Sequence, residues 1–502
     1  MTPATLSPPE AAPAARRWVV PALGAAAALA LAVRVAALFL LPNIDGDAYC
    51  YLDKAAQLRA AILAGTLRPA DLFYFWLPLY PLTVAAGSLV LPGGGHLMLV
   101  GKLVSATAGV AACWLAYRLL RAMTRRPAWA AAGALLVALD PWQTLYASNT
   151  MTELPFEALV LGALDRVVAR RWAAASLLLV AAGFVRIEAW GLAALVPVAA
   201  FAAERRVRLA PVLLAGVAPM VWLAISYAAR GDALAYFAAR NVYVAEYLAY
   251  RPEQRGLTAA RAAVDLASLR EAMGGPFTVG AVAAASFLLW SLARRRVPAG
   301  AGAAGAAMAV YGFLLAFLLA AYATRSQPVL WVRYGLIYQP LGACLTLWWL
   351  AEGAGRGVRP AAVALLGTWL AAHTTVEAWI VLGTRGNLLF QREAGAILAA
   401  ARPRRVYCDS AAVCVEAGLG RDRVRDSFDV RHDPVGFLED LRRGEVDYVV
   451  FIAYEVSVPV KLFPELAGFR SAHGLEPFRK IDSPDWRPPV LIYRVQNVPN
   501  GD

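Results

Sequence analysis

Long apolar segments alternate with short basic or polar breaks over most of the chain. About 20 apolar residues in a row are enough to cross a bilayer as a helix. The first such segment, Trp18 to Leu41, has 24 residues and is interrupted only by Arg34. The apolar core of a cleavable signal is shorter, so we expect an uncleaved anchor. Eleven ranges are predicted to span the membrane: 18–41, 97–119, 127–146, 152–168, 172–187, 189–203, 209–228, 277–293, 300–322, 334–351 and 360–382.

Arginine clusters between these segments predict the orientation of the chain. Cytoplasmic loops of membrane proteins are enriched in Lys and Arg. If every cluster is cytoplasmic, the N-terminus lies in the cytoplasm, with residues 1–17 as a disordered tail, and the C-terminus lies outside. The clusters are Arg16-Arg17, Arg121 with Arg125-Arg126, Arg166 with Arg170-Arg171, Arg205-Arg206 with Arg208, Arg294-Arg295-Arg296, and Arg356 with Arg359.

The first outer loop, residues 42–96, is expected to hold two surface-lying helices. Residues 77–92 are apolar, but a full crossing there would place every later arginine cluster on the wrong side, so we expect an interfacial or re-entrant segment. An earlier helix is predicted to lie along the membrane surface because its apolar residues recur at helical spacing. These residues are Tyr51, Ala55, Leu58 and Ile62.

A second large outer loop, residues 229–276, interleaves arginine with tyrosine. Such a pattern can bind a phosphate by charge pairing and a sugar by ring stacking. It is equally typical of a partly ordered amphipathic loop. The residues concerned are Arg240, Tyr243, Glu246, Tyr247, Tyr250, Arg251 and Arg255.

Residues 385–502 have the composition of a soluble domain. Helical and strand-like segments alternate there, which predicts a small α/β domain outside the cytoplasm. No glycine-rich phosphate loop occurs in it, so no nucleotide site is assigned. Asp409, directly after the first strand, is a weak candidate site residue. Helices are expected at 392–401 and 434–443, and strands at 405–408, 446–452 and near 474–479 and 489–495.

Composition supports an integral membrane protein. Hydrophobic residues make up 60% of the 502 residues and charged residues only 17%, whereas soluble proteins carry about a quarter charged residues. The net charge of +13 is uneven, because residues 391–502 hold 16 Lys+Arg against 17 Asp+Glu and residues 1–390 hold 32 against 18. The basic excess therefore lies in membrane loops, where it indicates orientation rather than nucleic-acid binding.

The five cysteines show no zinc-binding spacing. Cys408 and Cys414 can form a disulfide in an oxidising compartment, or remain two free thiols.

Two acids follow the first apolar segment, in the stretch Asn43 to Lys54. Asp45 and Asp47 stand two residues apart and next to Tyr49 and Tyr51. Carboxylates at the mouth of a membrane helix are costly, which favours a functional site. The alternative is an ordinary solvated loop just outside the bilayer.

Four further charged residues are expected at outer ends of spans, on the same side as Asp45 and Asp47. They are Glu153, Arg186, Glu188 and Arg333. Structural alternatives are a local Arg186–Glu188 ion pair that caps a helical hairpin and an Arg333 that reaches to the membrane interface. Convergence on one face favours a site, because unrelated structural charges need not share a side.

In the order and sidedness of these motifs, the chain resembles the GT-C class of membrane glycosyltransferases. This class includes protein O-mannosyltransferases, aminoarabinose transferases acting on lipid A and catalytic subunits of oligosaccharyltransferase. The resemblance covers residues 18–382. It rests on Asp47-Ala48-Tyr49-Cys50-Tyr51, on Glu153 at a helix start, on Arg186-Ile187-Glu188 and on Arg333-Tyr334.

The resemblance implies transfer of a sugar, with a mannose-like hexose as the first expectation, from a polyprenyl-phosphate donor to an acceptor hydroxyl outside the cytoplasm. Asp47 is then the general base and Glu153 a second catalytic acid. Arg333 is expected to bind the departing phosphate, with Arg240 or Arg186 in reserve. Residues expected to contact the donor phosphate or sugar are Arg333, Tyr334, Arg186, Glu188, Arg240, Tyr49 and Tyr51.

Two points of the family pattern stay open. Some relatives carry a lysine or histidine where this chain has Phe75-Trp76-Leu77-Pro78, which weakens the assignment of Arg333. A divalent cation, Mg²⁺ or Mn²⁺, held by Asp45, Asp47 and Glu153 is a further option, since hard cations bind carboxylate oxygens.

Competing functions use the same architecture. A transporter or flippase of lipid-linked sugars is the main alternative, although such proteins often contain paired halves and charges near the bilayer midplane, and no repeat is evident in this sequence. An inactive membrane scaffold is the third. The expected partners of the transferase are the lipid-linked sugar, a protein, lipid or glycan acceptor and membrane lipid, and no nucleic acid.

Overall fold

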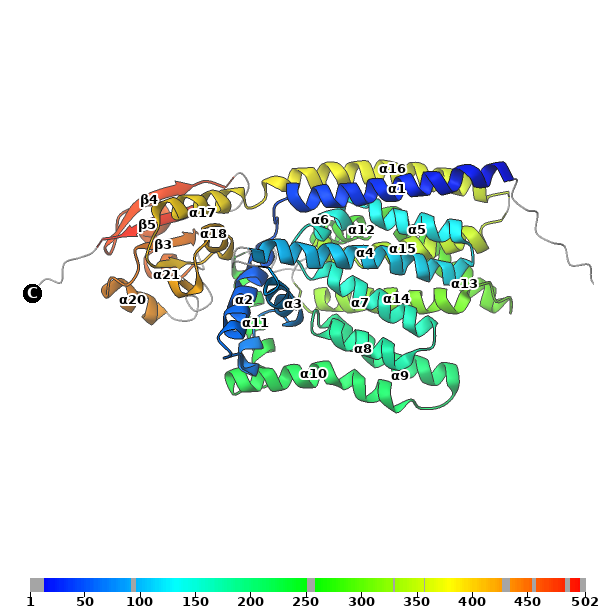
Figure 1. Ribbon diagram of the computed structural model, residues 1–502, viewed down its shortest axis with the longest axis horizontal. Coiled ribbons are helices and arrows are strands. Elements are labelled where there is room, and N and C mark those ends of the chain that lie inside the picture. Colours follow the sequence, from blue (N-terminus) through cyan, green and yellow to red (C-terminus); the bar gives the residue numbers. More distant parts are fainter. Residues whose placement is uncertain are drawn as a thin grey trace, which may run out of the picture.

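A long helical bundle carries a small sheet domain at one end (Figure 1). The chain is seen in a computed structural model. It describes residues 13–91, 96–250, 258–327, 330–355, 357–426, 434–453, 457–483 and 488–496. Residues 1–12 of the expected N-terminal tail lie outside this part of the chain.

Helices of the bundle run roughly parallel to its long axis (Figure 1). They are α1 (Pro13–Leu40), α4 (Leu97–Thr124), α5 (Pro127–Leu139), α6 (Pro141–Ala147), α7 (Glu153–Val168), α8 (Trp172–Gly183), α9 (Glu188–Glu204), α10 (Leu209–Arg230), α13 (Gly275–Ala293), α14 (Ala301–Ala323), α15 (Tyr338–Trp348) and α16 (Arg359–Gly383).

A helix occupies each of the eleven predicted ranges, and two of them contain irregularities. The range 127–146 is broken at Asp140, whose carboxylate accepts a hydrogen bond from the Gln143 backbone N–H at 2.8 Å and so caps α6, with Pro141 at its first position. The range 334–351 ends in a π-helix, Trp349–Gly353. Among the described residues, five helices are long and apolar enough to cross a membrane by length and composition. They are Leu97–Thr124, Leu209–Arg230, Gly275–Ala293, Ala301–Ala323 and the run Arg359–Ala401, which contains α16 and, after a short 3₁₀-helix and a turn, α17.

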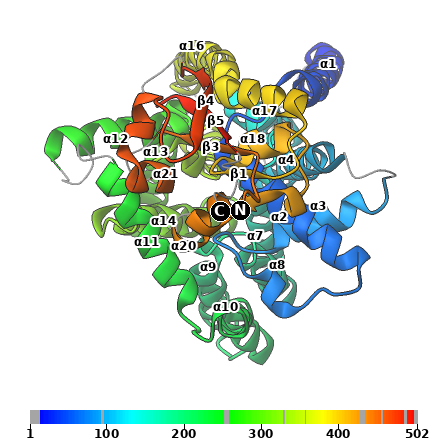
Figure 2. The ribbon, with the colours of Figure 1, turned by 90° about the vertical axis from the view of Figure 1, so that its left-hand side faces the viewer.

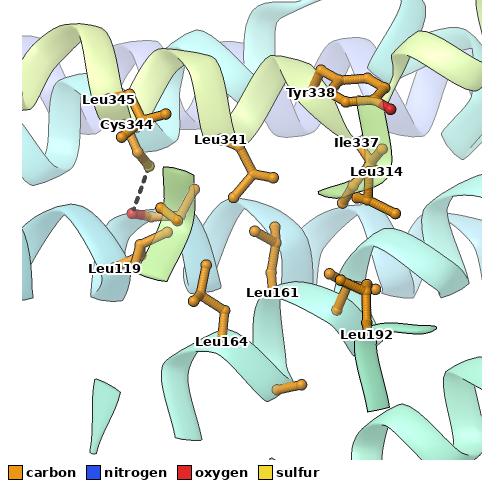
Figure 3. Close-up of a cluster of buried hydrophobic side chains, with 14 of the residues drawn as sticks. Leu119, Leu161, Leu164, Leu192, Leu314, Ile337, Tyr338, Leu341, Cys344 and Leu345 are labelled. Atoms are coloured by element: carbon orange, nitrogen blue, oxygen red, sulfur yellow. Dashed lines mark hydrogen bonds between the residues drawn. The ribbon is translucent and has the colours of Figure 1, made fainter. Parts of the chain in front are cut away.

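The largest apolar core of the bundle lies where α4, α7, α9, α14 and α15 meet (Figure 3). Leu341 and Cys344 of α15 face Leu119 of α4 and Leu161 of α7 in this core. Each of these four side chains is at most 2% exposed. Aliphatic side chains at helical spacing produce this packing, and it holds the helix ends that carry the site in fixed relation.

Both outer loops contain helices that lie at the end of the bundle next to the sheet domain (Figure 1). The first loop forms α2 (Gly46–Leu63), the 3₁₀-helix η1 (Pro69–Leu72) and α3 (Leu79–Ser88). With 10 residues, α3 is too short to cross a bilayer, as expected for residues 77–92. The second loop forms α11 (Ala235–Tyr250) and α12 (Ala259–Ala272). Arg251 and Arg255 lie outside the described residues, as do the side chains of Glu246, Tyr247 and Tyr250.

The C-terminal region forms a five-stranded mixed sheet in the order β2-β1-β3-β5-β4. β1 pairs in parallel with β2 and β3, and β5 runs antiparallel to β3 and β4. The strands are β1 (Val406–Cys408), β2 (Val424–Asp426), β3 (Tyr448–Ile452), β4 (Leu475–Ile481) and β5 (Val490–Val495), and the helices are α17 (Leu389–Ala401), α18 (Ala411–Glu416), α20 (Pro434–Arg442) and α21 (Val458–Leu462). The sequence pattern did not predict the short elements β2, α18 and α21.

Two candidate features of this domain are structural. Asp409 accepts hydrogen bonds from the Ile452 backbone N–H at 2.9 Å and from the Ser457 hydroxyl at 3.2 Å, so it joins β1 to the end of β3. Cys408 and Cys414 are both buried and are not joined by a disulfide.

The C-terminal domain packs onto α2, as the end-on view illustrates (Figure 2). Tyr49 and Leu52 of α2 share a buried cluster with Leu388 and with Ala412 of α18. The helix ends that carry the arginine clusters of the sequence lie at the opposite end of the bundle (Figure 1).

Candidate active site

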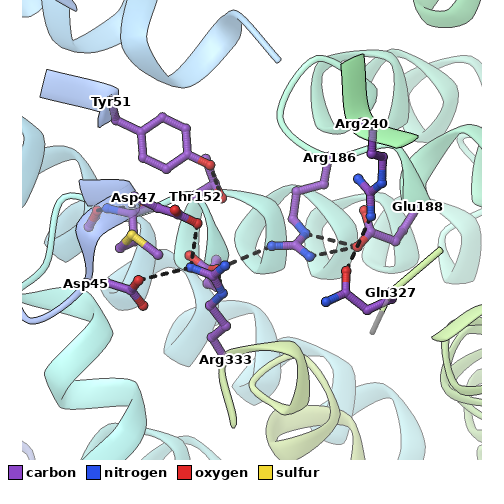
Figure 4. Close-up of polar contacts among 12 residues, drawn as sticks. Asp45, Asp47, Tyr51, Thr152, Arg186, Glu188, Arg240, Gln327 and Arg333 are labelled. Atoms are coloured by element: carbon purple, nitrogen blue, oxygen red, sulfur yellow. Dashed lines mark hydrogen bonds and ion pairs between the residues drawn. The ribbon is translucent and has the colours of Figure 1, made fainter. Parts of the chain in front are cut away.

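A cavity of about 140 Å³ opens at the end of the bundle next to the C-terminal domain. Residues far apart in the sequence line it, because helix ends from both halves of the membrane region converge there. Its charged lining consists of Asp47, Glu153, Arg186, Glu188, Arg240 and Arg333. Six of the seven charged site residues expected from the sequence are therefore brought together. The seventh, Asp45, lies beside Arg333 at 3.3 Å (Figure 4).

Arg333, in the 3₁₀-helix η4 (Val332–Gly335), is shared between three carboxylates. Its Nη1 lies 2.7 Å from Asp47 Oδ2 and 3.3 Å from Asp45 Oδ1, and its Nε lies 3.9 Å from Glu153 Oε1. The side chain is only 15% exposed. Arg333 is therefore a member of the charged cluster rather than an arginine that reaches to the membrane surface.

Arg186, in the turn between α8 and α9, forms the second half of the cluster. It lies 2.7 Å from Glu188 and 3.3 Å from Glu153. The local ion pair considered from the sequence is present, but the contact with Glu153 links it to α7 as well. Its guanidinium also lies 5.4 Å from the centre of the Tyr334 ring, within the range of a cation–π contact.

Two asparagines hold the acidic loop against the start of α7. Asn149 Oδ1 accepts a hydrogen bond from the Ile44 backbone N–H at 3.0 Å, and Asn43 Oδ1 accepts one from the Thr150 backbone N–H at 3.0 Å. Both asparagines are fully buried. This reciprocal clasp sets Asp45 and Asp47 beside Glu153. Sequence analysis did not single out this pair, although asparagine in a loop often bonds neighbouring backbone.

Gln143 and Lys102 anchor the surroundings of the site. The Gln143 amide donates to Glu157 on α7 at 2.8 Å and to the Leu336 carbonyl at 3.1 Å, just after the segment that carries Arg333. Lys102 donates to the Leu41 carbonyl at 2.6 Å at the end of α1, where carbonyls lack helical partners. No local sequence signal identifies either contact.

Burial and neighbouring charges have opposite effects on the pKa values of Asp45 and Arg333. Burial raises the pKa of Asp45, Arg333 lowers it by less, and nearby Asp47 raises it further, so the pKa of this carboxyl lies above its ordinary value. For Arg333, burial lowers the pKa, but Asp47 and Asp45 more than compensate, and the guanidinium stays charged. The cluster thus keeps a full positive charge on Arg333 beside the carboxyl groups of Asp47 and Asp45.

Aromatic side chains form the other walls of the cavity. Tyr51 lines it, bonds the Thr152 hydroxyl at 3.3 Å and packs against Trp76 at 5.5 Å between ring centres. Tyr243 of α11 packs against Phe75 at 4.9 Å. Aromatic faces of this kind suit the apolar faces of a sugar ring.

Arg240 also faces the cavity from α11, and its guanidinium donates to the Gln327 amide oxygen at 3.3 Å (Figure 4). Two residues of the second outer loop, Arg240 and Tyr243, therefore line the cavity.

Tyr49 does not belong to the cavity, contrary to expectation. Its side chain is fully buried, and its hydroxyl donates to Glu416 of the C-terminal domain at 2.7 Å. The reason is helix geometry, since residues two apart on an α-helix point to nearly opposite sides. Tyr51 therefore faces the cavity and Tyr49 faces away from it.

The three acids proposed as metal ligands are not arranged around a cation. Arg333 lies among Asp45, Asp47 and Glu153 and supplies the positive charge that a metal ion would bring. In the described part of the chain, no group of three or more His, Cys, Asp or Glu side chains is placed to hold a metal ion. The predicted Mg²⁺ or Mn²⁺ site does not fit this geometry, and no step below uses it.

No protein-family model and no curated protein sequence matches this chain, but several solved structures do. ArnT from Cupriavidus metallidurans in the apo state matches with a TM-score of 0.56 and 17% identity, over 96% of this chain and 98% of that chain. The same protein bound to undecaprenyl phosphate matches with a TM-score of 0.58 and 16% identity, over 97% and 99%. The apo oligosaccharyltransferase of Archaeoglobus fulgidus matches with a TM-score of 0.50 and 13% identity, over 87% and 70%.

These matches show that the chain shares its fold with ArnT and oligosaccharyltransferase, both of the GT-C class. The polytopic membrane fold that the sequence resemblance implied is confirmed. The number of crossings and the orientation across the membrane stay predictions.

Proposed function

We propose that this chain is an integral-membrane glycosyltransferase. It takes a hexose-type sugar, mannose-like as the first expectation, from a polyprenyl-phosphate donor and transfers it to an acceptor hydroxyl. The observation that carries the proposal is the pairing of an acid and a cation on one cavity wall, with Asp47 and Arg333 2.7 Å apart. Sugar transfer from a phosphate needs both groups, because one must remove a proton and the other must neutralise a leaving phosphate.

The site residues then take distinct roles. The Asp47 carboxylate accepts the proton of the acceptor hydroxyl, whose oxygen bonds to the sugar C1 as the bond between C1 and the phosphate oxygen breaks. The electron pair of that bond leaves with polyprenyl phosphate, and Arg333 neutralises its charge, with Arg186 and Arg240 close by. Glu153 contacts both Arg333 and Arg186 and holds the two cations in place. Tyr51 and Tyr334 are proposed to face the sugar.

Apolar space supports a lipid-linked donor. Helices α7, α9 and α14, which contribute to the charged cavity, also enclose a cavity of about 90 Å³ lined only by aliphatic side chains. Ala306, Ala309 and Ala199 keep it open at the positions where larger side chains would fill it. Structures of the same fold include ArnT bound to undecaprenyl phosphate and an archaeal oligosaccharyltransferase with dolichol-phosphate.

Reaction at the face outside the cytoplasm follows from the arginine clusters, which lie at the other end of the bundle and favour the cytoplasm. The acceptor is a protein, a lipid or a glycan with a free hydroxyl.

The test incubates the purified protein in vesicles with a panel of polyprenyl-phosphate sugars and a mixture of candidate acceptors. We expect consumption of one donor with release of polyprenyl phosphate and a glycosylated product. A protein that moves the donor between leaflets without consuming it would instead be a flippase and would overturn the proposal.

A further inference from the structure

Arg333 presents one nitrogen atom to two acids that differ in position. Asp47 lines the cavity together with Arg333, whereas Asp45 contacts the guanidinium without lining the cavity. The contact to Asp47 is the shorter one, at 2.7 Å against 3.3 Å for Asp45. A ligand in the cavity therefore contacts the wall that Arg333 and Asp47 form. Figure 4 shows both acids reaching the Arg333 guanidinium.

In this arrangement the Oδ2 atom of Asp47 is occupied by Arg333, whose Nη1 lies 2.7 Å away. An acceptor hydroxyl that approaches this oxygen meets the guanidinium first. The same guanidinium is the preferred partner of a phosphate, because its planar set of N–H donors matches phosphate oxygens. A phosphate bound in the bidentate manner across Nη1 and Nη2 of Arg333 uses the same Nη1 atom that contacts Asp47 at 2.7 Å, so the phosphate and Asp47 compete for it.

Arg186 does not offer the same competition. It lies between Glu153 and Glu188, and both of those acids line the same cavity. Neither is on the loop that carries the base. Among the arginines that line the cavity in the described part of the chain, only Arg333 pairs directly with Asp47, the acid proposed to remove the proton.

Resting on the proposed function, we propose that the donor phosphate displaces Asp47 from Arg333 and so frees the base. Asp45, which does not line the cavity, stays paired with Arg333 and is a positioning residue that keeps the guanidinium at the cavity wall. The acceptor hydroxyl is deprotonated only after the donor is bound. Without a donor, the Asp47 oxygen stays paired with Arg333 and is not available to the acceptor hydroxyl.

The test measures binding of undecaprenyl phosphate, which carries no sugar, to the full-length protein in nanodiscs. If the phosphate competes with Asp47, Asp47→Asn binds it more tightly than the wild type, by roughly three- to tenfold, as expected for loss of one partly buried ion pair. Asp47→Glu retains the charge and should bind like the wild type. Asp47→Ser replaces Asp47→Asn if that variant does not fold.

Two matched variants complete the measurement. Asp53→Asn removes an acid from the same helix that hydrogen-bonds Gln57 and does not line the cavity, and it should leave the affinity unchanged. Arg333→Gln should weaken binding at least tenfold, because the phosphate loses its cation.

If Asp47→Asn and Asp47→Ser both bind undecaprenyl phosphate no more tightly than the wild type, the donor does not compete with Asp47 and the proposal is wrong. A wild type that does not bind undecaprenyl phosphate would also overturn it. The proposed function is judged separately, by sugar transfer. If Asp47→Asn binds undecaprenyl phosphate more tightly but no donor supports sugar transfer, the proposed glycosyltransferase function is wrong. The competition between phosphate and Asp47 for Arg333 is then still supported.

Discussion

At the residue scale, ionised groups in the charged cluster lower the free energy of unfolding while they provide the charges that the proposed reaction needs. Asp45 illustrates this, because the surrounding protein shields its half-buried carboxyl from water and raises its pKa despite the neighbouring Arg333. A folded-state pKa above the unfolded value means that the ionised form destabilises the fold near neutral pH. This cost disappears as the pH falls and the carboxyl takes up its proton. Strain of this kind is typical of functional sites.

We therefore expect Asp45→Asn to unfold at a higher temperature than the wild type near pH 7. The variant should bind polyprenyl phosphate less tightly, because Arg333 is less well fixed at the cavity wall. The stability difference should shrink as the pH falls, because the wild-type carboxyl then takes up its proton. Thermal unfolding of the detergent-solubilised protein at several pH values measures it, with Asp53→Asn as the control. A lower unfolding temperature of Asp45→Asn at neutral pH contradicts the assignment.

At the element scale, α2 connects the site to the C-terminal domain. One side of this helix carries Asp47 and Tyr51 toward the cavity, and the opposite side places Tyr49 against Glu416 of α18. Arg392 of α17 also contacts Glu416, at 3.4 Å. The C-terminal domain thus holds the helix that presents the proposed base.

Tyr49→Phe should loosen this contact. Loss of one hydrogen bond to a carboxylate lowers the free energy of unfolding by about 1–3 kcal/mol, and the C-terminal domain should become easier to release by limited proteolysis. Transfer should slow without being abolished, since Asp47 itself remains. Tyr117→Phe, on α4 and stacked against Trp114, removes a hydroxyl elsewhere and serves as the control. Identical proteolysis of both variants would show that the contact does not hold the domain.

The elements also show what could be predicted from the sequence. Hydropathy locates the bundle helices because lipid demands long apolar stretches. The order of the charged motifs predicted that Asp47, Glu153, Arg186, Glu188 and Arg333 lie on one side, and in the structure they line one cavity. The direction of Tyr49, the clasp of Asn43 with Asn149 and the insertion of Arg333 among the three acids were not predictable. They depend on contacts between distant segments, and no local pattern records which side chain fills the space between two helices.

At the scale of the whole molecule, charge divides the bundle into two ends. The site, the surface helices and the C-terminal domain share one end, and the arginine-rich helix ends lie at the other. This distribution predicts that the site faces away from the cytoplasm.

Labelling with a membrane-impermeant maleimide in intact cells tests the orientation. Lys480→Cys, on exposed β4 of the C-terminal domain, should react from outside, and Arg170→Cys, at the opposite end, should react only after permeabilisation. The parent chain provides the background, because its five cysteines are buried or half-buried. Reversed labelling would place the site in the cytoplasm and contradict the expected sidedness.

The release of polyprenyl phosphate from a polyprenyl-phosphate sugar, followed by mass spectrometry with wild type, Asp47→Asn and Asp53→Asn, tests the central claim most directly. We predict release by the wild type and Asp53→Asn, and a loss of about 10²- to 10⁴-fold in Asp47→Asn, as expected when a general base is removed. Release by Asp47→Asn at the wild-type rate would contradict the account.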